Sequence, residues 1–381
     1  MSWPLAKLDN HVDILSGFAF KSENFNDRGE GLPLVRIRDV VPGVSDTYYS
    51  GEYSSEFLLS DGDLLIGMDG DFNRARWNGG QALLNQRVCK VTAKGESLDQ
   101  GYLYHFLPKA LDKIHAETPA VTVKHLSVKG IRAIEIPLPP LPEQKRIAAI
   151  LDKADAIRRK RQQAIQLADD FLRAVFLDMF GELVTSSGYA NSQKYKLLEL
   201  VDYIDYRGKT PEKSESGIPL ITAKNVKSGY VDDEPREYIP EENYDAWMTR
   251  GFPRKNDVLF TTEAPLGNVA LLGEYEKVAI GQRLVALRSK GKVTHEYLLF
   301  LLLHPFIQDL IYARSSGSTV KGIRTKELYA IELPVPDMQK QREFSAVYWR
   351  SKSLTSNQES AHQLDLLNFS ALSQKAFAGQ L

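Results

Sequence analysis

The chain contains an internal repeat, and this repeat constrains its fold more than any other feature of its 381 residues. The stretch TVKHLSVKGIRAIEIPLP begins at Thr122 and aligns with TVKGIRTKELYAIELPVP, which begins at Thr319, 197 residues later. The same offset continues without a gap until Phe180 faces Phe377. Self-similarity at a long, constant spacing indicates duplicated structural units. We therefore expect two copies of one unit.

Shorter matches extend the repeat towards the start of each copy, with small changes in spacing. They are GLPLVRIRDV at Gly31 with GIPLITAKNV at Gly217, GDLLIG at Gly62 with NDVLFT at Asn256, and NQRV at Asn85 with GQRL at Gly281. The matching segments are short, apolar and bounded by Gly, Pro or Asp, which is typical of strands. Each copy is therefore predicted to contain a compact α/β domain.

A proline-rich run ends each domain and leads into a long helical pattern. Pro142 suits the first turn of a helix, and Asp337 can cap the second helix. Small and apolar residues then recur at alternating three- and four-residue steps, which is typical of a coiled coil. The predicted seam comprises Ile147, Ile150, Ala154, Ile157, Arg161 and Ala164 in the first helix, and Phe344, Val347, Leu354, Gln358 and Ala361 in the second.

The topology of the repeat predicts how these helices pair. The first helix leads from one domain to the other, so a two-fold relation between the copies requires the second helix to run back. The expected fold class is α/β, with two tandem α/β domains, each followed by a long helix, and an antiparallel coiled coil with pseudo-two-fold symmetry. The expected boundaries are 1–141 for the first domain, 142–180 for its helix, 181–336 for the second domain and 337–381 for its helix.

Composition excludes several classes of protein. Cys89 is the single cysteine, so neither an internal disulfide nor a cysteine-based metal site is possible. The start MSWPLAKLDN lacks the apolar core of a signal peptide, and the most apolar run, YLLFLLL, is too short to span a bilayer. We expect a cytoplasmic protein that does not engage membranes.

Catalytic signatures are also scarce. The sequence has no glycine-rich nucleotide loop and no phosphate-binding lysine motif. The triplet EQK at Glu143 has a nuclease-like spacing, but it opens a helix without a paired acidic strand. We therefore predict a binding protein with no catalytic residue, metal or cofactor of its own.

Polar loops that follow the predicted strands suggest DNA as the ligand. The net charge is only −1, so a DNA-binding surface must be a local patch. Arginine can contact guanine, Asn and Gln can contact adenine, and Lys or Arg in Ser/Gly loops can contact phosphates. The candidate DNA-binding residues are Arg36, Arg38, Asp69, Asn73, Arg74, Arg76, Trp77, Gln86 and Arg87 in the first copy, and Thr222, Lys224, Asn225, Arg314, Lys321 and Arg324 in the second.

Three further motifs are IPLPPLPEQKRIAAILDKADAI, FLRAVFLDMFGE at the end of the first helix and QKAFAGQL at the end of the second. Taken together, these motifs resemble the specificity subunits of type I restriction–modification systems, while VPDMQKQREF departs from the family pattern. The resemblance implies a non-catalytic subunit that binds double-stranded DNA through two target-recognition domains, one for each half of a split target.

The resemblance also implies partners and cofactors. Two methyltransferase subunits would carry S-adenosylmethionine, and two restriction subunits would use ATP and Mg. The residues alone leave other functions open. These are a stand-alone regulatory or architectural DNA-binding protein, a fused methyltransferase–nuclease, and a scaffold that does not bind DNA.

Overall fold

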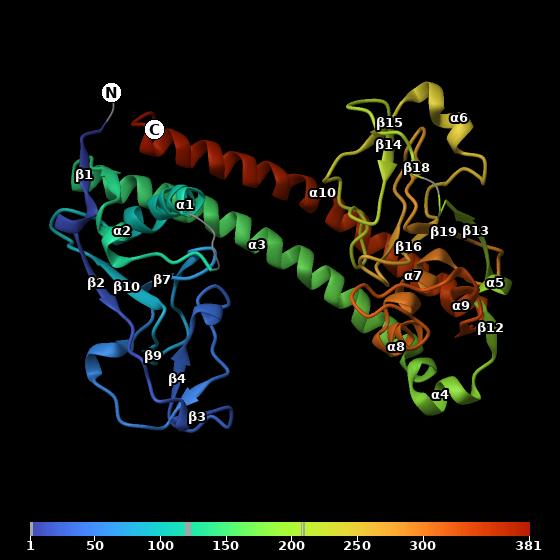
Figure 1. Ribbon diagram of the computed structural model, residues 1–381, viewed down its shortest axis with the longest axis horizontal. Helices are drawn as coiled ribbons and strands as arrows, with labels where there is room; N and C mark the ends of the chain where they lie inside the picture. The colour runs from blue at the N-terminus through green and yellow to red at the C-terminus, as the bar shows by residue number, and fades with distance from the viewer. Residues whose placement is uncertain (1–2, 119–122, 207, 209) are drawn as a thin grey trace. The chain divides into compact units, whose positions relative to one another are not determined.

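The computed structural model describes residues 3–118, 123–206, 208 and 210–381. The chain forms two compact units, of which the first comprises Met1–Gln162 with Ser360–Leu381 and the second comprises Gln163–Glu359. Each unit holds one α/β domain and parts of two long helices, α3 (Leu141–Phe180) and α10 (Met338–Phe377). The expected fold class, two α/β domains each followed by a long helix, is confirmed (Figure 1).

The domain of the first unit is built on two main sheets. The antiparallel sheet has the order β2-β10-β7-β8, and a five-stranded sheet has the order β3-β5-β4-β9-β6, in which β4 and β9 are parallel. A short pair, β1-β11, completes the strands. The bounds are β1 Leu5–Lys7, β2 Val12–Ser16, β3 Phe25–Asn26, β4 Leu32–Val35, β5 Tyr48–Tyr49, β6 Leu58–Leu59, β7 Leu64–Gly67, β8 Arg74–Arg76, β9 Ala82–Leu84, β10 Val88–Ala93, α1 Gln100–Glu117, α2 Val128–Arg132 and β11 Glu135–Pro137.

The second unit has a similar topology with a smaller second sheet. Its antiparallel sheet has the order β13-β19-β16-β17, its three-stranded sheet has the order β15-β14-β18 with β14 and β18 parallel, and β12 pairs with β20. The bounds are α4 Ser186–Asn191, β12 Lys194–Lys196, α5 Leu197–Leu200, β13 Val201–Asp205, β14 Ile218–Ile221, β15 Tyr238–Ile239, α6 Tyr244–Trp247, β16 Val258–Thr261, β17 Val269–Leu271, β18 Ala279–Ile280, β19 Leu284–Ser289, α7 His295–Leu303, α8 Pro305–Ala313, α9 Thr325–Tyr329 and β20 Glu332–Pro334.

One inner strand of each four-stranded antiparallel sheet, β7 in the first unit and β16 in the second, is buried on both faces. In β16, Val258 and Phe260 enter one hydrophobic cluster, while Leu259 enters another. In β7, Leu64 and Leu65 divide between two clusters in the same way. Successive side chains of a strand point to opposite faces, so a strand between two cores must be apolar throughout. This requirement accounts for the unbroken apolar runs LLI within DLLIG and VLF within DVLFT.

A buried glutamine attaches each long helix to its own domain. Gln144 accepts a hydrogen bond from the backbone N–H of Asp99 at 2.9 Å and donates to the carbonyls of Ser97 and Pro139. The side chain is 1% exposed. Because these contacts satisfy its carboxamide, Gln144 holds the start of α3 against the loop that precedes α1.

Gln341 makes the same contacts in the second unit. It accepts from the backbone N–H of Thr294 at 2.9 Å and donates to the carbonyls of Lys292 and Pro336. Asp337 accepts from the backbone N–H of Gln339 at 2.7 Å, so it caps α10 as predicted. The proline-to-helix motif therefore encodes a rigid joint between domain and helix.

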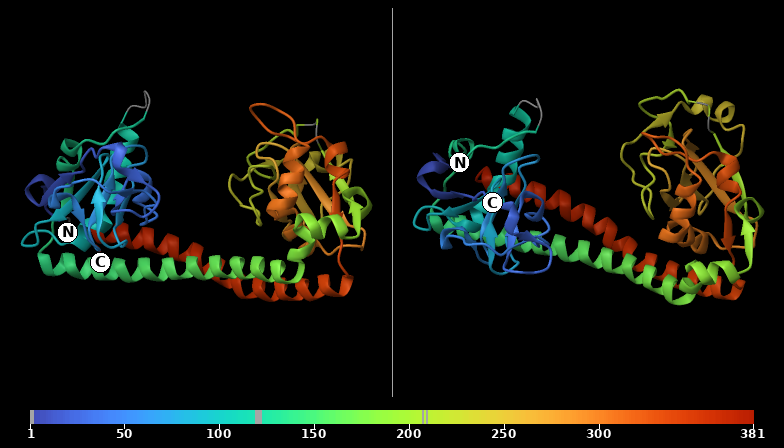
Figure 2. Two further views of the ribbon diagram at one scale, coloured as in Figure 1. Left: turned by 90° about the horizontal axis from the view of Figure 1, so that it is seen from below. Right: turned by 60° about the horizontal axis from the view of Figure 1, so that its bottom comes forward.

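The helices pair antiparallel in the first unit. The guanidinium carbon of Arg158 in α3 lies 5.3 Å from the ring centroid of Phe369 in α10. Three residues further along α3, Arg161 Nε lies 2.7 Å from Asp365 Oδ2, which is four residues earlier in α10. Both views of Figure 2 show the last turns of α10 beside the first half of α3.

The second unit pairs its helical segments in the same sense. Lys352 Nζ lies 3.2 Å from Asp169 Oδ1, and the rings of Phe344 and Phe176 are 5.5 Å apart. Residue numbers again rise on one helix as they fall on the other. The antiparallel pairing expected from the repeat is confirmed.

The phase of the predicted seam is partly wrong. Ile147 and Phe344 are buried as expected, with 1% and 0% exposed, but Ile157 is 46% exposed and Leu354 is 70% exposed. Ala164 and Gln358 are exposed as well. Ile150, Ala154, Val347 and Ala361 are partly exposed. The residues of α3 that are buried lie mostly one position later, at Ala148, Leu151, Asp155, Leu172 and Phe176.

The displacement has a physical cause. The start of α3 carries apolar residues at adjacent positions, such as Ile150 and Leu151, so two phases fit a three- and four-residue repeat equally well. Leu151 enters the core of the first domain, which selects its phase. Arg161, predicted as a polar seam residue, is partly buried and forms its ion pair with Asp365.

Candidate nucleic-acid interface

Three chain segments meet at one edge of the first domain. The backbone N–H of Met68, just after β7, donates to the carbonyl of Arg87 at 2.8 Å. The carbonyl of Met68 in turn accepts from the N–H of Leu126 at 2.7 Å. The N–H of Gln86 donates to the carbonyl of Phe18 at 2.8 Å. These backbone bonds hold the side chains of the loops that follow β7 and β9 close to one another.

The side chains at this edge form a charged cluster. Arg87 Nε lies 3.6 Å from Asp69 Oδ2, and His125 Nδ1 lies 2.6 Å from Asp69 Oδ1. Arg87 is 57% exposed. Its φ of 71° is unusual for any residue other than glycine, and such backbone strain is found most often at functional sites. The neighbouring Gln86 is exposed too.

The second domain has the same arrangement at the equivalent residues. The N–H of Thr262 donates to the carbonyl of Arg283 at 3.0 Å, and the carbonyl of Thr262 accepts from the N–H of Ile323 at 3.0 Å. Arg283 Nε lies 3.0 Å from Glu263 Oε1. We call Asp69 with Arg87, and Glu263 with Arg283, the arginine–carboxylate pairs.

The second pair borders a cleft of about 570 Å³. Its lining includes Glu263, Gln282, Arg283, Gly317 and Arg324. Gln282 Oε1 accepts from the hydroxyl of Thr210 at 3.3 Å, which orients its carboxamide. Donors and acceptors from four loops therefore converge on one recess.

Three candidates in the first copy do not belong to this surface. Trp77 is 1% exposed and donates through Nε1 to the carbonyl of Gly80, so it is a core residue. The guanidinium of Arg74 packs on the ring of Tyr104, 3.7 Å from its centroid. The structure contradicts their predicted role in DNA binding, because Trp77, just after β8, packs in a hydrophobic cluster and Arg74 packs on Tyr104.

Arg76, the third of these candidates, forms an ion pair within the protein and is not exposed on this surface. Its Nη1 lies 3.0 Å from Asp152 Oδ1 on α3, and the same carboxylate oxygen lies 2.9 Å from His105 Nε2. Arg76 therefore joins β8 to α1 and α3. Asn73, which precedes β8, is exposed and remains a candidate.

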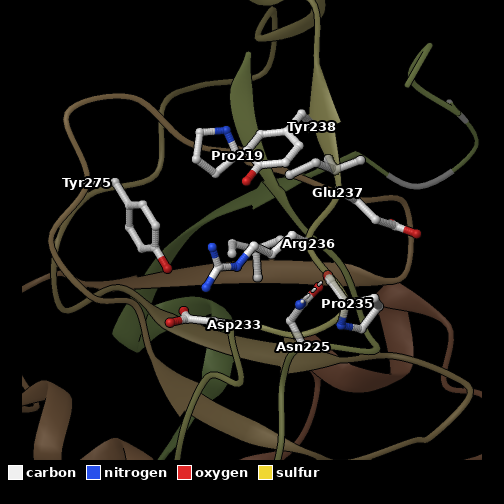
Figure 3. Close-up of a pocket in the computed structure, with 10 residues that line it drawn as sticks. Pro219, Asn225, Asp233, Pro235, Arg236, Glu237, Tyr238 and Tyr275 are labelled. Atoms are coloured by element: carbon white, nitrogen blue, oxygen red, sulfur yellow. Dashed lines mark hydrogen bonds between the residues drawn. The ribbon is translucent and has the colours of Figure 1, made fainter. Parts of the chain in front are cut away.

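Asn225 is a second correction. It is 2% exposed and accepts from the N–H of Thr222, while its amide nitrogen donates to the carbonyls of Asp232 and Pro235. Figure 3 shows Asn225 beside Pro235, at the wall of a hollow of about 280 Å³ that Tyr275 also lines. Every polar atom of the carboxamide is used to close this turn, so neither Asn225 nor Thr222 is free to read a base.

The equivalent turn in the first copy is closed by Asp39, which accepts from the N–H of Arg36 at 2.9 Å. Arg36 itself donates through Nη2 to the hydroxyl of Thr47 at 2.6 Å and is partly buried. Arg38 is exposed, 3.6 Å from Asp39. Lys224 is exposed, 3.5 Å from Glu237.

The remaining cations lie around the cleft of the second domain. Arg324 lines it, and Lys321 and Arg314 lie exposed on the loop between α8 and α9. Arg314 Nη1 donates to the carbonyl of Leu310 at 3.3 Å. These residues can supply positive charge to a phosphate backbone next to the arginine–carboxylate pair.

Four residues of the two clusters were missed by sequence reasoning. The alignment of NQRV with GQRL already placed Gln282 and Arg283 opposite Gln86 and Arg87. The alignment of GDLLIG with NDVLFT, continued by two residues, likewise places Glu263 opposite Asp69. His125 carried no comparable signal, because its partner is distant in the sequence. The repeat could have identified the first three residues, and only the fold identifies His125.

Comparison with known proteins agrees with this architecture. Residues 2–167 and 190–347 match the family described as Type I restriction modification DNA specificity domain. The chain belongs to this family, and as a specificity subunit it is a DNA-recognition component and not a catalytic one.

Two specificity subunits illustrate the relationship. The chain is 33% identical to the type I restriction enzyme EcoBI specificity subunit of Escherichia coli, over 90% of this chain and 77% of the relative. It is 22% identical to the MjaVIII specificity subunit of Methanocaldococcus jannaschii, over 85% of this chain and 88% of the relative.

A solved structure shares the fold. The type I restriction–modification S subunit from M. genitalium matches with a TM-score of 0.62 at 15% identity, covering 99% of this chain and 96% of that one. Within the part of the chain that the structure describes, no helix has the length and apolar character needed to cross a membrane.

Proposed function

We propose that this chain reads a two-part DNA target, with one half-site for each domain. The observation that carries the proposal is the repetition of the arginine–carboxylate pair. Arg87 with Asp69 and Arg283 with Glu263 are held by the same backbone hydrogen bonds in two domains whose loops differ in length. Exposed Arg and Gln side chains on a common scaffold are suited to base-edge contacts.

The differences between the two domains suit the reading of an asymmetric target. His125 lies beside Asp69 in the first domain, whereas Gly322 occupies the equivalent position beside Glu263 in the second. At the offset of 197 residues Arg314 faces Glu117 in the first copy, whereas Lys321 faces Lys124. One scaffold with different neighbouring side chains would read two different half-sites.

The long helices offer the second half of the function, which is the docking of partners. The apolar side chains on their surface include Ile157, Leu167, Leu354 and Leu364, which are exposed by 46–70%. They form repeat-equivalent sets, because Ile157 corresponds to Leu354 and Leu167 corresponds to Leu364. Ile157 and Leu364 belong to the first unit, and Leu167 and Leu354 belong to the second.

Exposed apolar residues on a helix surface mark interaction sites, and two equivalent sets suit two copies of one partner. The partner we propose is the methyltransferase subunit, which would bring S-adenosylmethionine. Two restriction subunits, with ATP and Mg, would complete the assembly in the cytoplasm. Membership of the family favours this assembly over a stand-alone regulatory protein.

Co-expression with a type I methyltransferase subunit tests the function. The purified complex should methylate adenines within one two-part motif, and the isolated chain should not turn over S-adenosylmethionine. A double Leu167→Lys, Leu354→Lys variant should reduce the bound methyltransferase from two copies to one in native mass spectrometry. Ser353→Lys, an exposed neighbour, is the matched control. Methyl transfer by the chain alone would refute the proposal.

A further inference from the structure

The arginine–carboxylate pairs have a donor and acceptor pattern that selects one kind of base pair. In both units the carboxylate engages the Nε edge of the guanidinium, at 3.6 Å in the first unit and 3.0 Å in the second. Among the residues that the structure describes, the terminal nitrogens of Arg283 have no hydrogen-bond partner, and in Arg87 only Nη1 has one, His125 Nδ1 at 3.5 Å. Both terminal nitrogens of Arg283 and Nη2 of Arg87 are therefore available as donors. Half or more of each arginine side chain is exposed, at 57% and 50%.

A G·C pair presents the matching pattern in the major groove. Guanine offers two acceptors, N7 and O6, and its paired cytosine offers one donor, the N4 amino group. Two adjacent donors on arginine followed by a carboxylate acceptor complement this edge. In an A·T pair the N6 donor of adenine lies between two acceptors, adenine N7 and thymine O4. Two arginine donors followed by a carboxylate would then leave hydrogen-bonding groups of the protein and of the base pair without partners.

The carboxylate also argues against a simple phosphate contact. An arginine beside an acidic side chain has its charge largely compensated, so a phosphate gains little attraction and meets a like charge. A base edge carries no net charge and is not repelled. Lys321 and Arg324 form no ion pair among the residues that the structure describes, so they are better suited to phosphates.

The carboxylate has a further effect on affinity. A free arginine loses rotamer entropy when it binds, whereas one already held by Asp69 or Glu263 loses less. In the first unit His125 fixes the acid in turn, and Arg87 Nη1 lies 3.5 Å from His125 Nδ1. The pair is therefore oriented before DNA arrives.

We propose that each arginine–carboxylate pair reads one G·C base pair, so that each half-site of the target contains one. Arg87 and Asp69 read the pair in one half-site, and Arg283 and Glu263 read the pair in the other. This inference rests on the proposed function and adds to it the identity of one base pair in each half-site.

The experiment uses the full chain in complex with its methyltransferase and maps adenine methylation on a randomised DNA library. The wild-type motif should hold one fixed G·C pair in each half-site. Arg87→Lys and Arg283→Lys keep the charge but cannot make two parallel contacts. Each variant should lower the preference for G·C at one position of one half-site by about 10- to 100-fold.

Lys321→Gln is the matched control. It removes a positive charge near the second arginine–carboxylate pair, and this charge has no acidic partner among the described residues. It should slow methylation of all sequences alike. The inference is overturned if either wild-type half-site lacks a fixed G·C pair, or if the lysine variants keep the wild-type motif. A wild-type complex that methylates without any two-part motif would overturn the proposed function itself, before any variant is compared.

Discussion

The side-chain oxygen of Asn225 accepts two hydrogen bonds from Thr222, one from its backbone N–H at 3.0 Å and one from its hydroxyl at 2.9 Å. Replacing Asn225 by Ala removes the partner of these donors and of the carbonyls of Asp232 and Pro235. We expect a loss of about 2–4 kcal/mol in the free energy of unfolding, since each unsatisfied buried group costs about 1–3 kcal/mol. Denaturant titration measures the loss.

The recognised motif should not change in the same variant, because Asn225 closes a turn and does not contact DNA in our interpretation. Lys224→Ala is the matched control, since its exposed side chain should alter unfolding by less than about 0.5 kcal/mol. A stable Asn225→Ala protein with an altered motif would restore the original prediction that Asn225 reads a base.

The two buried glutamines that attach the long helices to their domains, Gln144 and Gln341, predict a second effect on stability. Gln341→Ala removes the acceptor for Thr294 and the donors to two carbonyls, and it leaves a cavity at a side chain that is 0% exposed. We expect a loss of about 2–4 kcal/mol. Gln339→Ala, on the exposed face of the same helix, should cost less than about 0.5 kcal/mol. Equal denaturation midpoints for the two variants would contradict the role of the joint.

His105 predicts a pH dependence in the first unit. Burial lowers the pKa of His105 from its ordinary value of 6.5, although the Asp152 carboxylate acts in the opposite direction. The unfolded chain therefore binds this proton at a higher pH than the folded chain, so stability falls as the pH drops below about 6.5.

His105→Phe introduces the residue that the second copy has at the equivalent position, Phe300, and removes this titration. The melting temperature of the wild type should fall more between pH 7.5 and 5.5 than that of the variant. Calorimetry at several pH values checks the difference. Parallel profiles would show that His105 does not titrate differently on folding.

The paired helices predict an effect on target spacing. We expect that inserting four residues after Arg161, with four more after Gln358, lengthens both helices by about 6 Å and rotates them by about 40°. DNA rises about 3.4 Å per base pair, so the gap between half-sites should grow by one or two base pairs. An insertion in one helix alone should be tolerated less, because it shifts the pairing register.

Methylation mapping of the reconstituted complex reads the gap directly. The half-sites themselves should stay the same, since each domain keeps its loops. A gap that stays constant while the half-sites change would show that the helices do not determine the distance.

The duplicated architecture could be predicted because its signals are local and occur twice. The proline-to-helix motif and the offset of 197 residues required two similar units, and antiparallel pairing followed from symmetry. The exact face of the helix could not be predicted, because Ile150 and Leu151 fit two phases and only the domain core distinguishes them.

The candidate site was harder to predict, because polar residues in a loop look alike before their partners are known. Arg76 and Arg87 follow similar glycine-rich stretches, but Asp152, 76 residues away, engages Arg76, while Arg87 stays exposed. Contacts of this kind depend on the tertiary fold. The repeat alone pairs Arg87 with Arg283, because NQRV aligns with GQRL.

The division of the chain has a consequence for its synthesis. The first unit needs residues 360–381, which place Ala376 in its core, whereas the second unit is one continuous segment. Domains generally fold as they emerge from the ribosome, with the N-terminal one first. Here the second unit is complete in sequence while the first still lacks its last helical segment. The domain that the ribosome begins first is the one that it completes last.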